Sequence, residues 1–169
     1  MTAKLILCVT AHGAIGALFE HGRLAPCQKF PATEAGQRGF GDLLRAHPAV
    51  PVYLMADSVE EDYHAEALPH VSGHARHELL QRKLKQLYRS TPYYTAWIQG
   101  RDTGKRRDDR YLFAALTNAD ILRPWLDVLQ AHQAPLAGLF LLPMVSQELI
   151  ALLKLTQPDV LLVSKHHDG

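Results

Sequence analysis

The first 30 residues alternate short apolar segments with two tight turns, and this feature restricts the possible folds more than any other. Residues 5–9 form a continuous apolar run, typical of a strand buried on both faces. The chain turns at residues 10–14 and returns as a strand over residues 15–20. His21-Gly22 forms the next turn, because glycine accepts a positive φ at no steric cost, and residues 23–30 follow as a third strand. The sequence therefore predicts an antiparallel three-stranded meander.

Pro26 predicts an edge position for the third strand, since proline has no N–H to donate to a neighbouring strand. Thr33 is a suitable N-cap for a helix that ends near Ala46, and residues 50–56 are a short apolar strand. The order of three strands, a helix and a strand indicates a mixed sheet in an α/β protein.

The middle of the chain has a different character and predicts an inserted subdomain over residues 58–117. The acidic loop that leads into it contains Asp57, Glu60, Glu61, Asp62 and Glu66. An amphipathic helix is expected over residues 72–88. Strands over residues 93–99 and 111–116 then form a hairpin with a polar loop.

The last part of the chain returns to alternating helices and strands, so residues 1–57 and 118–169 are expected to form one core lobe. The predicted elements are a helix over residues 118–132, a strand over 136–142, a helix over 143–154 and a strand over 159–164. Pro124 is tolerated in the first of these helices only as a kink or near the first turn.

Composition excludes several function classes. The 169 residues suit one domain, with or without a small insertion, and the net charge of +1 gives no general attraction to nucleic acid or anionic membranes. No segment approaches the roughly 18 apolar residues of a membrane span, and the N-terminal apolar run is too short for a signal peptide. Cys8 and Cys27 are expected to be small core residues in a reducing compartment. A cytoplasmic protein is therefore expected.

The order of elements resembles one half of the actin-like ATPase fold, itself a relative of the ribonuclease-H fold. More narrowly, it looks like the lineage of the cell-division protein FtsA, the pilus-assembly protein PilM and the cytoplasmic domain of the secretion protein GspL. The similarity rests on the insert over residues 57–116, on residues 126–139, which are similar to the segment re-entering the main sheet, and on residues 146–153. The resemblance implies the meander, the alternating helices and strands, and a small inserted helix-and-hairpin subdomain.

The resemblance makes the turn between the first two strands a test of activity. Actin-like ATPases place an Asp and a Gly there, and ribonuclease-H-type nucleases place an Asp on the first strand, because Mg²⁺ prefers carboxylate and water ligands. Residues 7–13 contain no carboxylate, Thr10 stands where the Asp is expected, and only Gly13 keeps the pattern. Thr10, His12 and Gly13 would contact a nucleotide if one bound, but a hydroxyl cannot supply the missing charge. Catalysis is therefore not expected.

The resemblance also implies that nucleotide binds between two copies of this fold, and the chain reaches only what looks like the first strand of a second copy. We therefore expect no cofactor, with ATP and Mg²⁺ binding only if a second lobe completes the site. A fragment of a longer protein and a half-size relative are both consistent with the sequence.

Three histidines, His70, His74 and His77, have a spacing that can bind zinc on one helix face. Gly73 is expected near the helix start, which would leave His70 outside the helix, so a solvated polar face is the preferred interpretation. Gln81 replaces the second histidine of an H-E-x-x-H motif, which excludes that zinc site. No metal site is expected.

Basic residues gather in the insert among aromatic ones. The candidate partner-binding residues are Arg82, Lys85, Arg89, Arg101, Lys105, Arg106 and Arg107. Together with Tyr93, Tyr94 and Trp97 they could contact phosphates and stack on bases, as single-stranded nucleic acid requires. The neighbouring acidic loop favours a protein partner instead, because complementary charged patches set partner choice.

The preferred hypothesis is a non-catalytic actin-like scaffold that binds other proteins through its insert, in a bacterial pilus or secretion assembly. Two alternatives stay open. One is a nucleotide-binding module that requires a second lobe, and the other is a single-stranded nucleic-acid-binding domain that uses the basic insert.

Overall fold

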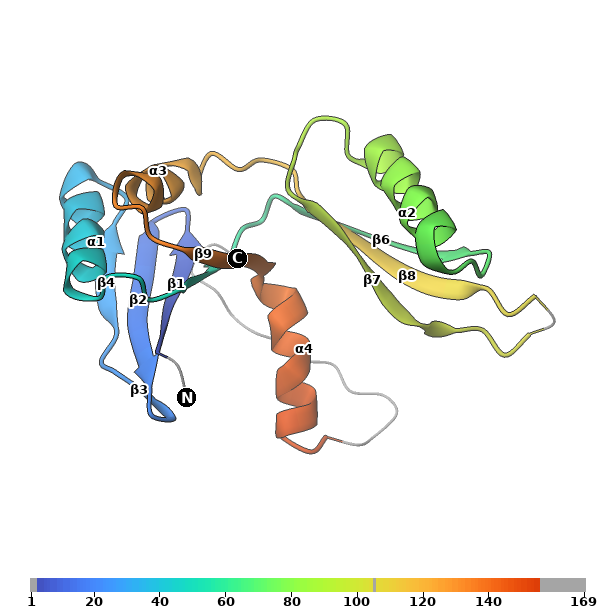
Figure 1. The fold of residues 1–169 in the computed structure, drawn as a ribbon, viewed down its shortest axis with the longest axis horizontal. Helices are drawn as coiled ribbons and strands as arrows, with labels where there is room; N and C mark the ends of the chain where they lie inside the picture. The colour runs from blue at the N-terminus through green and yellow to red at the C-terminus, as the bar shows by residue number, and fades with distance from the viewer. Residues whose placement is uncertain (1–2, 105, 156–169) are drawn as a thin grey trace. The chain divides into compact units, whose positions relative to one another are not determined.

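The computed structural model describes residues 3–104 and 106–155, which divide into two compact units (Figure 1). The first unit comprises Met1–Val59 and Asp120–Gly169, and the second comprises Glu60–Ala119. None of the helices in the described ranges is long and apolar enough to cross a membrane. The strand predicted over residues 159–164 lies outside the described residues.

The first unit opens with the predicted meander. Its strands are β1 (Lys4–Thr10), β2 (Gly13–Glu20), β3 (Arg23–Leu24) and β4 (Gln28–Pro31). All pairings among them are antiparallel: β2 pairs with β1 and also with β3 and β4. His21 and Gly22 connect β2 to β3 with positive φ angles of 52° and 77°, the conformation that a two-residue type I′ hairpin turn requires.

The third strand of the meander is interrupted rather than continuous. Pro26 lies in the gap between β3 and β4, and both short strands stand beside β2 at the end of the sheet, as an edge position for proline requires. Cys27 lies in the same gap and is exposed, so the expectation of a core position for Cys27 is wrong. Cys8 is half-buried on β1, and both cysteines are free thiols.

The rest of the first unit adds parallel strands and helices to the meander. Its elements are α1 (Glu34–Ala46), β5 (Val52–Ala56), α3 (Arg123–Ala131), β9 (Leu136–Leu141) and α4 (Leu142–Leu152). The sheet order is β3-β2-β1-β5-β9, with β5 parallel to both β1 and β9. Thr33 caps α1 as predicted, its Oγ1 accepting a hydrogen bond from the Gly36 N–H at 3.4 Å. The helix α3 begins later than predicted, because Pro124 occupies its first turn.

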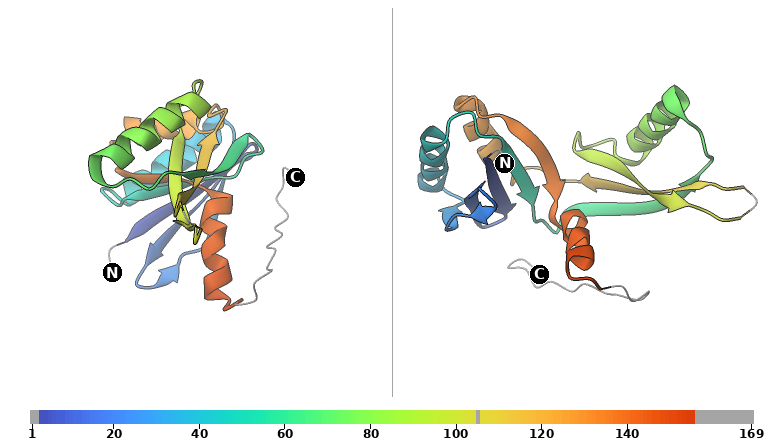
Figure 2. Two further views of the ribbon diagram at one scale, coloured as in Figure 1. Left: turned by 90° about the vertical axis from the view of Figure 1, so that its right-hand side faces the viewer. Right: turned by 60° about the horizontal axis from the view of Figure 1, so that its bottom comes forward.

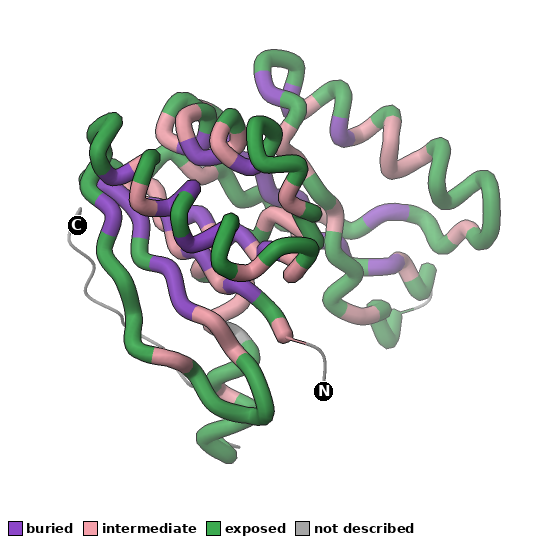
Figure 3. The backbone as a smooth tube through the Cα atoms, turned by 60° about the vertical axis from the view of Figure 1, so that its left-hand side comes forward, coloured by how far each residue is buried: buried purple, intermediate pink, exposed green. Residues whose placement is uncertain are grey.

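Helices α1 and α3 pack together on the sheet (Figure 2). An aromatic cluster joins them to β4. Phe40 of α1 and Trp125 of α3 are 0% and 2% exposed, and their ring centroids lie 6.0 Å apart, with Phe30 of β4 against both. Along β1, buried residues alternate with half-buried ones (Figure 3), of which Ile6 is one. The prediction that residues 5–9 are buried on both faces is therefore wrong: only one face is fully covered.

The second unit is a three-stranded antiparallel sheet with one helix. Its elements are β6 (Glu61–Leu68), α2 (Gly73–Leu87), β7 (Tyr94–Arg101) and β8 (Asp109–Leu116), with β8 in the centre of the sheet. The side chains of Leu84 and Tyr88 at the end of α2 pack against Tyr111 and Phe113 of β8. The predicted helix and hairpin are both present, and the hairpin strands extend further toward their turn than predicted.

Strand β6 was predicted to belong to an acidic loop, and this prediction is wrong. Carboxylate side chains have low intrinsic strand propensity, so Glu61, Asp62 and Glu66 made this segment look like a loop in the sequence. Pairing with the apolar strand β8 outweighs that preference. An edge strand tolerates such charges and uses them to prevent further pairing.

Candidate functional site

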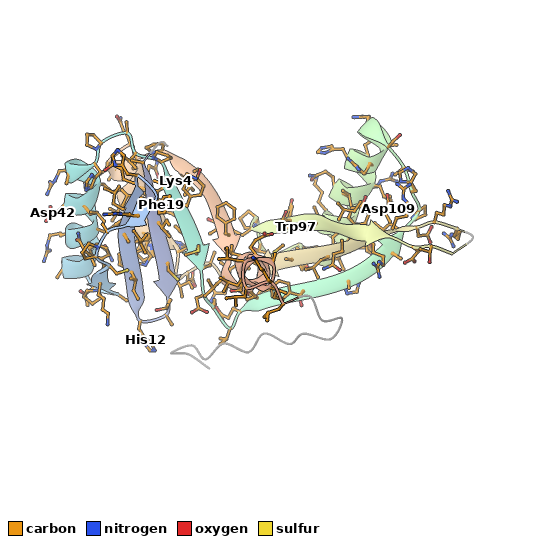
Figure 4. All side chains as sticks on the ribbon, turned by 90° about the horizontal axis from the view of Figure 1, so that it is seen from below. Lys4, His12, Phe19, Asp42, Trp97 and Asp109 are labelled. Carbon is orange, nitrogen blue, oxygen red and sulfur yellow. The ribbon has the colours of Figure 1, made fainter. Side chains whose placement is uncertain are left out.

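The turn between β1 and β2 contains Thr10, His12 and Gly13, and the Thr10 hydroxyl is hydrogen-bonded within it. Thr10 Oγ1 accepts the His12 N–H at 3.2 Å and lies 3.4 Å from the Gly13 carbonyl oxygen. The side chain of His12 is at the tip of the hairpin (Figure 4), while the His12 carbonyl accepts the Ala32 N–H at 3.1 Å. The Thr10 hydroxyl thus stabilises the turn.

Gly13 is required by packing. Its φ of 146° is one that residues with a side chain rarely adopt, and a Cβ at this position would lie 2.2 Å from the Phe30 carbonyl oxygen. The contact arises because Gly13 pairs with Pro31, so β4 runs directly against the turn. The fold therefore needs glycine here whether or not a phosphate ever binds.

A carboxylate that the sequence placed only in the acidic loop follows the neighbouring strand. Val9 of β1 pairs with Ala56 of β5, and the Asp57 N–H donates to the Val9 carbonyl oxygen at 2.9 Å. Asp57 therefore follows β5 where Thr10 ends β1, because the carboxyl ends of parallel strands meet at one edge of a sheet. Burial, and secondarily the charge of Asp57, raises the pKa of the Cys8 thiol. The sequence contained a signal for this position of Asp57, because one apolar strand ends at Thr10 and the next ends just before Asp57.

The three histidines are not brought together. His70 precedes α2, as the position of Gly73 predicted, and its Nδ1 lies 2.7 Å from Asp109 Oδ2. His74 lies on the helix, with its Nε2 3.2 Å from Glu78 Oε1. In residues 3–104 and 106–155, no three His, Cys, Asp or Glu side chains are arranged to hold a metal ion.

Asp109 is a carboxylate that the sequence did not single out, because it was assigned to the hairpin loop. The side chain is 1% exposed, and both its oxygens are engaged: His70 Nδ1 is 2.7 Å from Oδ2, and Arg101 Nε donates to Oδ1 at 2.7 Å. His70, followed by Arg101, holds the pKa of the Asp109 carboxyl below its usual range. Arg101, a predicted partner-binding residue, is thus committed to an internal ion pair.

Two other arginines of the hairpin also pair with nearby carboxylates. Arg106 Nε lies 3.3 Å from Asp108 Oδ2, and Arg110 Nε lies 3.6 Å from Asp102 Oδ1. Arg107 is exposed at the turn with a φ of 50°, and Lys105 lies outside the described residues. Much of the positive charge that the sequence placed on the hairpin is therefore neutralised locally.

The basic residues of α2 differ from those of the hairpin. We call Arg82, Lys85 and Arg89 the cationic row: Arg82 and Lys85 are one turn apart on α2, and Arg89 follows its C-cap residue, Tyr88. All three are exposed, and none forms an ion pair with any residue in the described ranges. Lys85 and Arg89 border a shallow pocket of about 450 Å³ together with Tyr94 of β7. Lys83 is not in the row, because its Nζ lies 2.7 Å from Glu66 Oε2 of β6.

Trp97, an exposed aromatic side chain of the insert, is on the other face of the sheet. Tyr94 and Ala96 pack toward α2, and the Tyr94 ring stacks against Tyr88 at 6.4 Å between centroids. Because side chains alternate along a strand, Trp97 faces away from α2, where it lies across from Leu112 and is 49% exposed. The cationic row and Trp97 thus do not form a single surface for phosphates and stacked bases.

Comparison with known proteins supports the fold. No protein-family model matches the sequence, and no curated protein matches it. Among solved structures, the chain is similar to the cytoplasmic domain of EpsL, an inner membrane component of the type II secretion system of Vibrio cholerae, with a TM-score of 0.50 and 9% identity over 82% of this chain and 57% of that one. It is also similar to a chain of the PilM-PilN type IV pilus biogenesis complex, with a TM-score of 0.59 and 13% identity over 89% of this chain and 51% of that one.

The chain thus spans between 51% and 57% of the length of these structures. At such identities the similarity concerns the fold. It agrees with the partial actin-like, ribonuclease-H-like architecture expected from the order of the elements, including the mixed sheet with its N-terminal meander.

Proposed function

We propose that this chain is a non-catalytic scaffold that binds another protein through its inserted unit, at the cytoplasmic face of a pilus or secretion assembly. The observation that carries the proposal is the cationic row of α2, whose three charges have no ion-pair partner in the described part of the chain. Unpaired charges of one sign along a helix favour a partner of the opposite charge and fix its register. The fold-level similarity to secretion and pilus proteins supports this class of role by analogy.

A second exposed surface supports the same role. Helix α4 has no fully buried residue among its described side chains, and Leu149, Leu152 and the following Leu153 are 45%, 75% and 59% exposed. Soluble domains rarely leave several large apolar side chains together in water unless another surface covers them.

The first experiment tests whether the chain captures a protein partner through the cationic row. The 169-residue chain is immobilised and exposed to a lysate of the source organism, beside the Arg82→Glu/Lys85→Glu/Arg89→Glu variant and an Arg76→Glu control on the same helix. A retained protein is identified by mass spectrometry, purified and tested again for direct binding. We expect binding to the wild type and the control and loss in the triple variant. Equal binding by all three proteins would remove the insert from the proposal.

Nucleotide hydrolysis is measured on the same protein. Magnesium-dependent ATP hydrolysis that is lost in Thr10→Val or Asp57→Asn would overturn the non-catalytic part of the proposal. The Thr10→Val change keeps the shape of the side chain but also removes the hydrogen bonds of the hydroxyl within the turn, so folding of this variant is checked by amide exchange.

The second candidate function, a nucleotide-binding module that requires a second lobe, is favoured by one observation. Asp57 provides a carboxylate beside Thr10, at the sheet edge where the turn itself has none. This alternative predicts magnesium-dependent ATP affinity in a longer chain with a second lobe, and loss of that affinity in Asp57→Asn.

A further inference from the structure

One edge of the sheet in the second unit is open for pairing. Strand β7 pairs with β8 on one side, and no described strand pairs with its other side. The Leu116 N–H donates to the Tyr93 carbonyl oxygen, so in this antiparallel register Thr95 and Trp97 also direct their peptide groups toward β8. The N–H and C=O groups of Tyr94, Ala96 and Ile98 therefore point away from the sheet.

The composition of β7 does not protect this edge. From Tyr94 to Gly100 the strand contains no charged residue and no proline, and Trp97 and Ile98 are 49% and 44% exposed. The opposite edge strand, β6, carries three carboxylates, which discourage pairing. The two edge strands of this sheet thus differ in charge, and of the two only β7 is suited to pair with a further strand.

The two faces that flank the open edge differ in charge. On one face, Lys85 and Arg89 of the cationic row border a pocket with Tyr94. On the other face, Trp97 presents an exposed apolar surface across from Leu112. Since alternate side chains of a strand point to opposite faces, a strand added here would place every second side chain near cations and the others near Trp97.

We infer that β7 is the docking edge for an extended segment of a partner protein, which adds to the sheet as a fourth strand with acidic side chains toward α2 and apolar ones toward Trp97. Main-chain hydrogen bonds to Tyr94, Ala96 and Ile98 would supply the affinity, and the two faces would supply the specificity. This inference rests on the proposed function and specifies how the partner binds.

A second copy of the chain is a poorer occupant of this edge. Edge-to-edge pairing of two copies about a two-fold axis would place both α2 helices on the same face of a continuous sheet. Both cationic rows would then lie on one face of that sheet, where their like charges add and oppose association. An acidic segment neutralises the same residues.

The test uses defined peptides with the full chain. The probe is a fluorescein-labelled octapeptide of alternating Glu and Val, and the controls are the Lys–Val peptide and a Glu–Val peptide N-methylated on alternate residues, which cannot pair along one edge. Binding is followed by fluorescence anisotropy, by exchange of the amide hydrogens of β7 and by tryptophan emission, in which Trp97 is the exposed one of the two tryptophans.

We expect the Glu–Val peptide to bind at least about tenfold more tightly than the Lys–Val peptide, an advantage that exposed ion pairs with Lys85 and Arg89 can provide. Binding should slow exchange at Tyr94, Ala96 and Ile98, shift tryptophan emission to shorter wavelength, and weaken with salt. The N-methylated peptide should not bind. On the protein side, Ala96→Pro removes an outward N–H, whereas Arg76→Glu is the charge control that should bind as the wild type does.

Absence of binding, or binding that leaves exchange at Ala96 unchanged, would overturn the inference. Because the N-methylated control alters only the peptide, the conclusion does not depend on whether Ala96→Pro folds. A concentration-dependent dimer that protects the same amides without peptide would also overturn it, in favour of self-pairing. The proposed function fails separately, if no protein partner binds the insert at all.

Discussion

Arg101 and Asp109 close the hairpin of the second unit through an ion pair in which Arg101 Nε lies 2.7 Å from Asp109 Oδ1. His70 Nδ1 lies at the same distance from the other carboxylate oxygen. A charge that is only 1% exposed is costly unless it is paired and hydrogen-bonded, and here both oxygens are satisfied. Through its two contacts, Asp109 therefore connects His70, in the segment before α2, to Arg101 at the end of β7.

Replacing Asp109 with Asn should destabilise the second unit. The amide keeps the size of the side chain but removes the charge. It has one acceptor oxygen where the carboxylate has two, so Arg101 and His70 can no longer both contact an acceptor oxygen. Urea unfolding followed by amide exchange along β8 should show a lower midpoint for this variant. The control is Asp102→Asn, which breaks the exposed pair with Arg110 and should stay within about 0.5 kcal/mol of the wild type. Equal effects of the two substitutions would contradict a special role for Asp109.

The same ion pair predicts how the second unit responds to acid. His70 and Arg101 lower the pKa of Asp109 in the folded state relative to its ordinary value of 3.8. The resulting stability is complete above that ordinary value and is lost as the pH falls through the lowered folded value. Acid titration of the wild type should therefore show the β8 amides losing protection at low pH, with a weaker pH dependence in Asp109→Asn. Identical acid profiles for the two proteins would refute this.

The elements that local patterns define were predictable. Thr33 caps α1 and the His21-Gly22 turn takes its two positive φ angles because the local sequence itself determines both conformations. The break at Pro26 was foreseen only as an edge position, since the missing N–H signals where a proline can stand but not whether the strand continues across it.

The features that depend on tertiary pairing could not be read from the sequence. Strand β6 exists because β8 supplies its ladder, and its carboxylates argue against a strand when considered alone. Asp57 comes beside Thr10 only through the parallel pairing of β1 with β5, and Asp109 meets His70 across 39 residues. The basic cluster was visible as composition, but its division into paired hairpin arginines and an unpaired cationic row required side-chain geometry.

The aromatic cluster of the first unit should dominate its stability. Phe40 is 0% exposed between Phe30 and Trp125, so Phe40→Ala leaves a cavity that α1 and the sheet cannot close. We expect a loss of about 3–5 kcal/mol in the free energy of unfolding, measured by urea denaturation. Leu24→Ala, at a position 54% exposed on β3, should change it by no more than about 0.5 kcal/mol. Comparable losses would mean that the cluster is not the core of this unit.

Gly13 separates a packing requirement from a requirement of phosphate chemistry. In Gly13→Ala the new Cβ would lie 2.2 Å from the Phe30 carbonyl oxygen, in a backbone conformation with φ of 146°. Relief of that overlap means moving β4 away from β2, so we expect a loss of about 3 kcal/mol or more and faster amide exchange along β4. Gly22→Ala is the matched control: φ there is 77°, but no atom lies within 4 Å of the added Cβ, so only the backbone cost of about 1–2 kcal/mol remains.

The difference between the two glycine variants is the informative quantity, because both carry the cost of a positive φ and only one carries the overlap with β4. A larger loss for Gly13→Ala in the absence of any nucleotide would show that the fold alone, through this overlap and the φ of 146°, requires glycine in this turn. Equal losses would show instead that β4 yields at little cost, and the presence of glycine in the turn would then need another explanation.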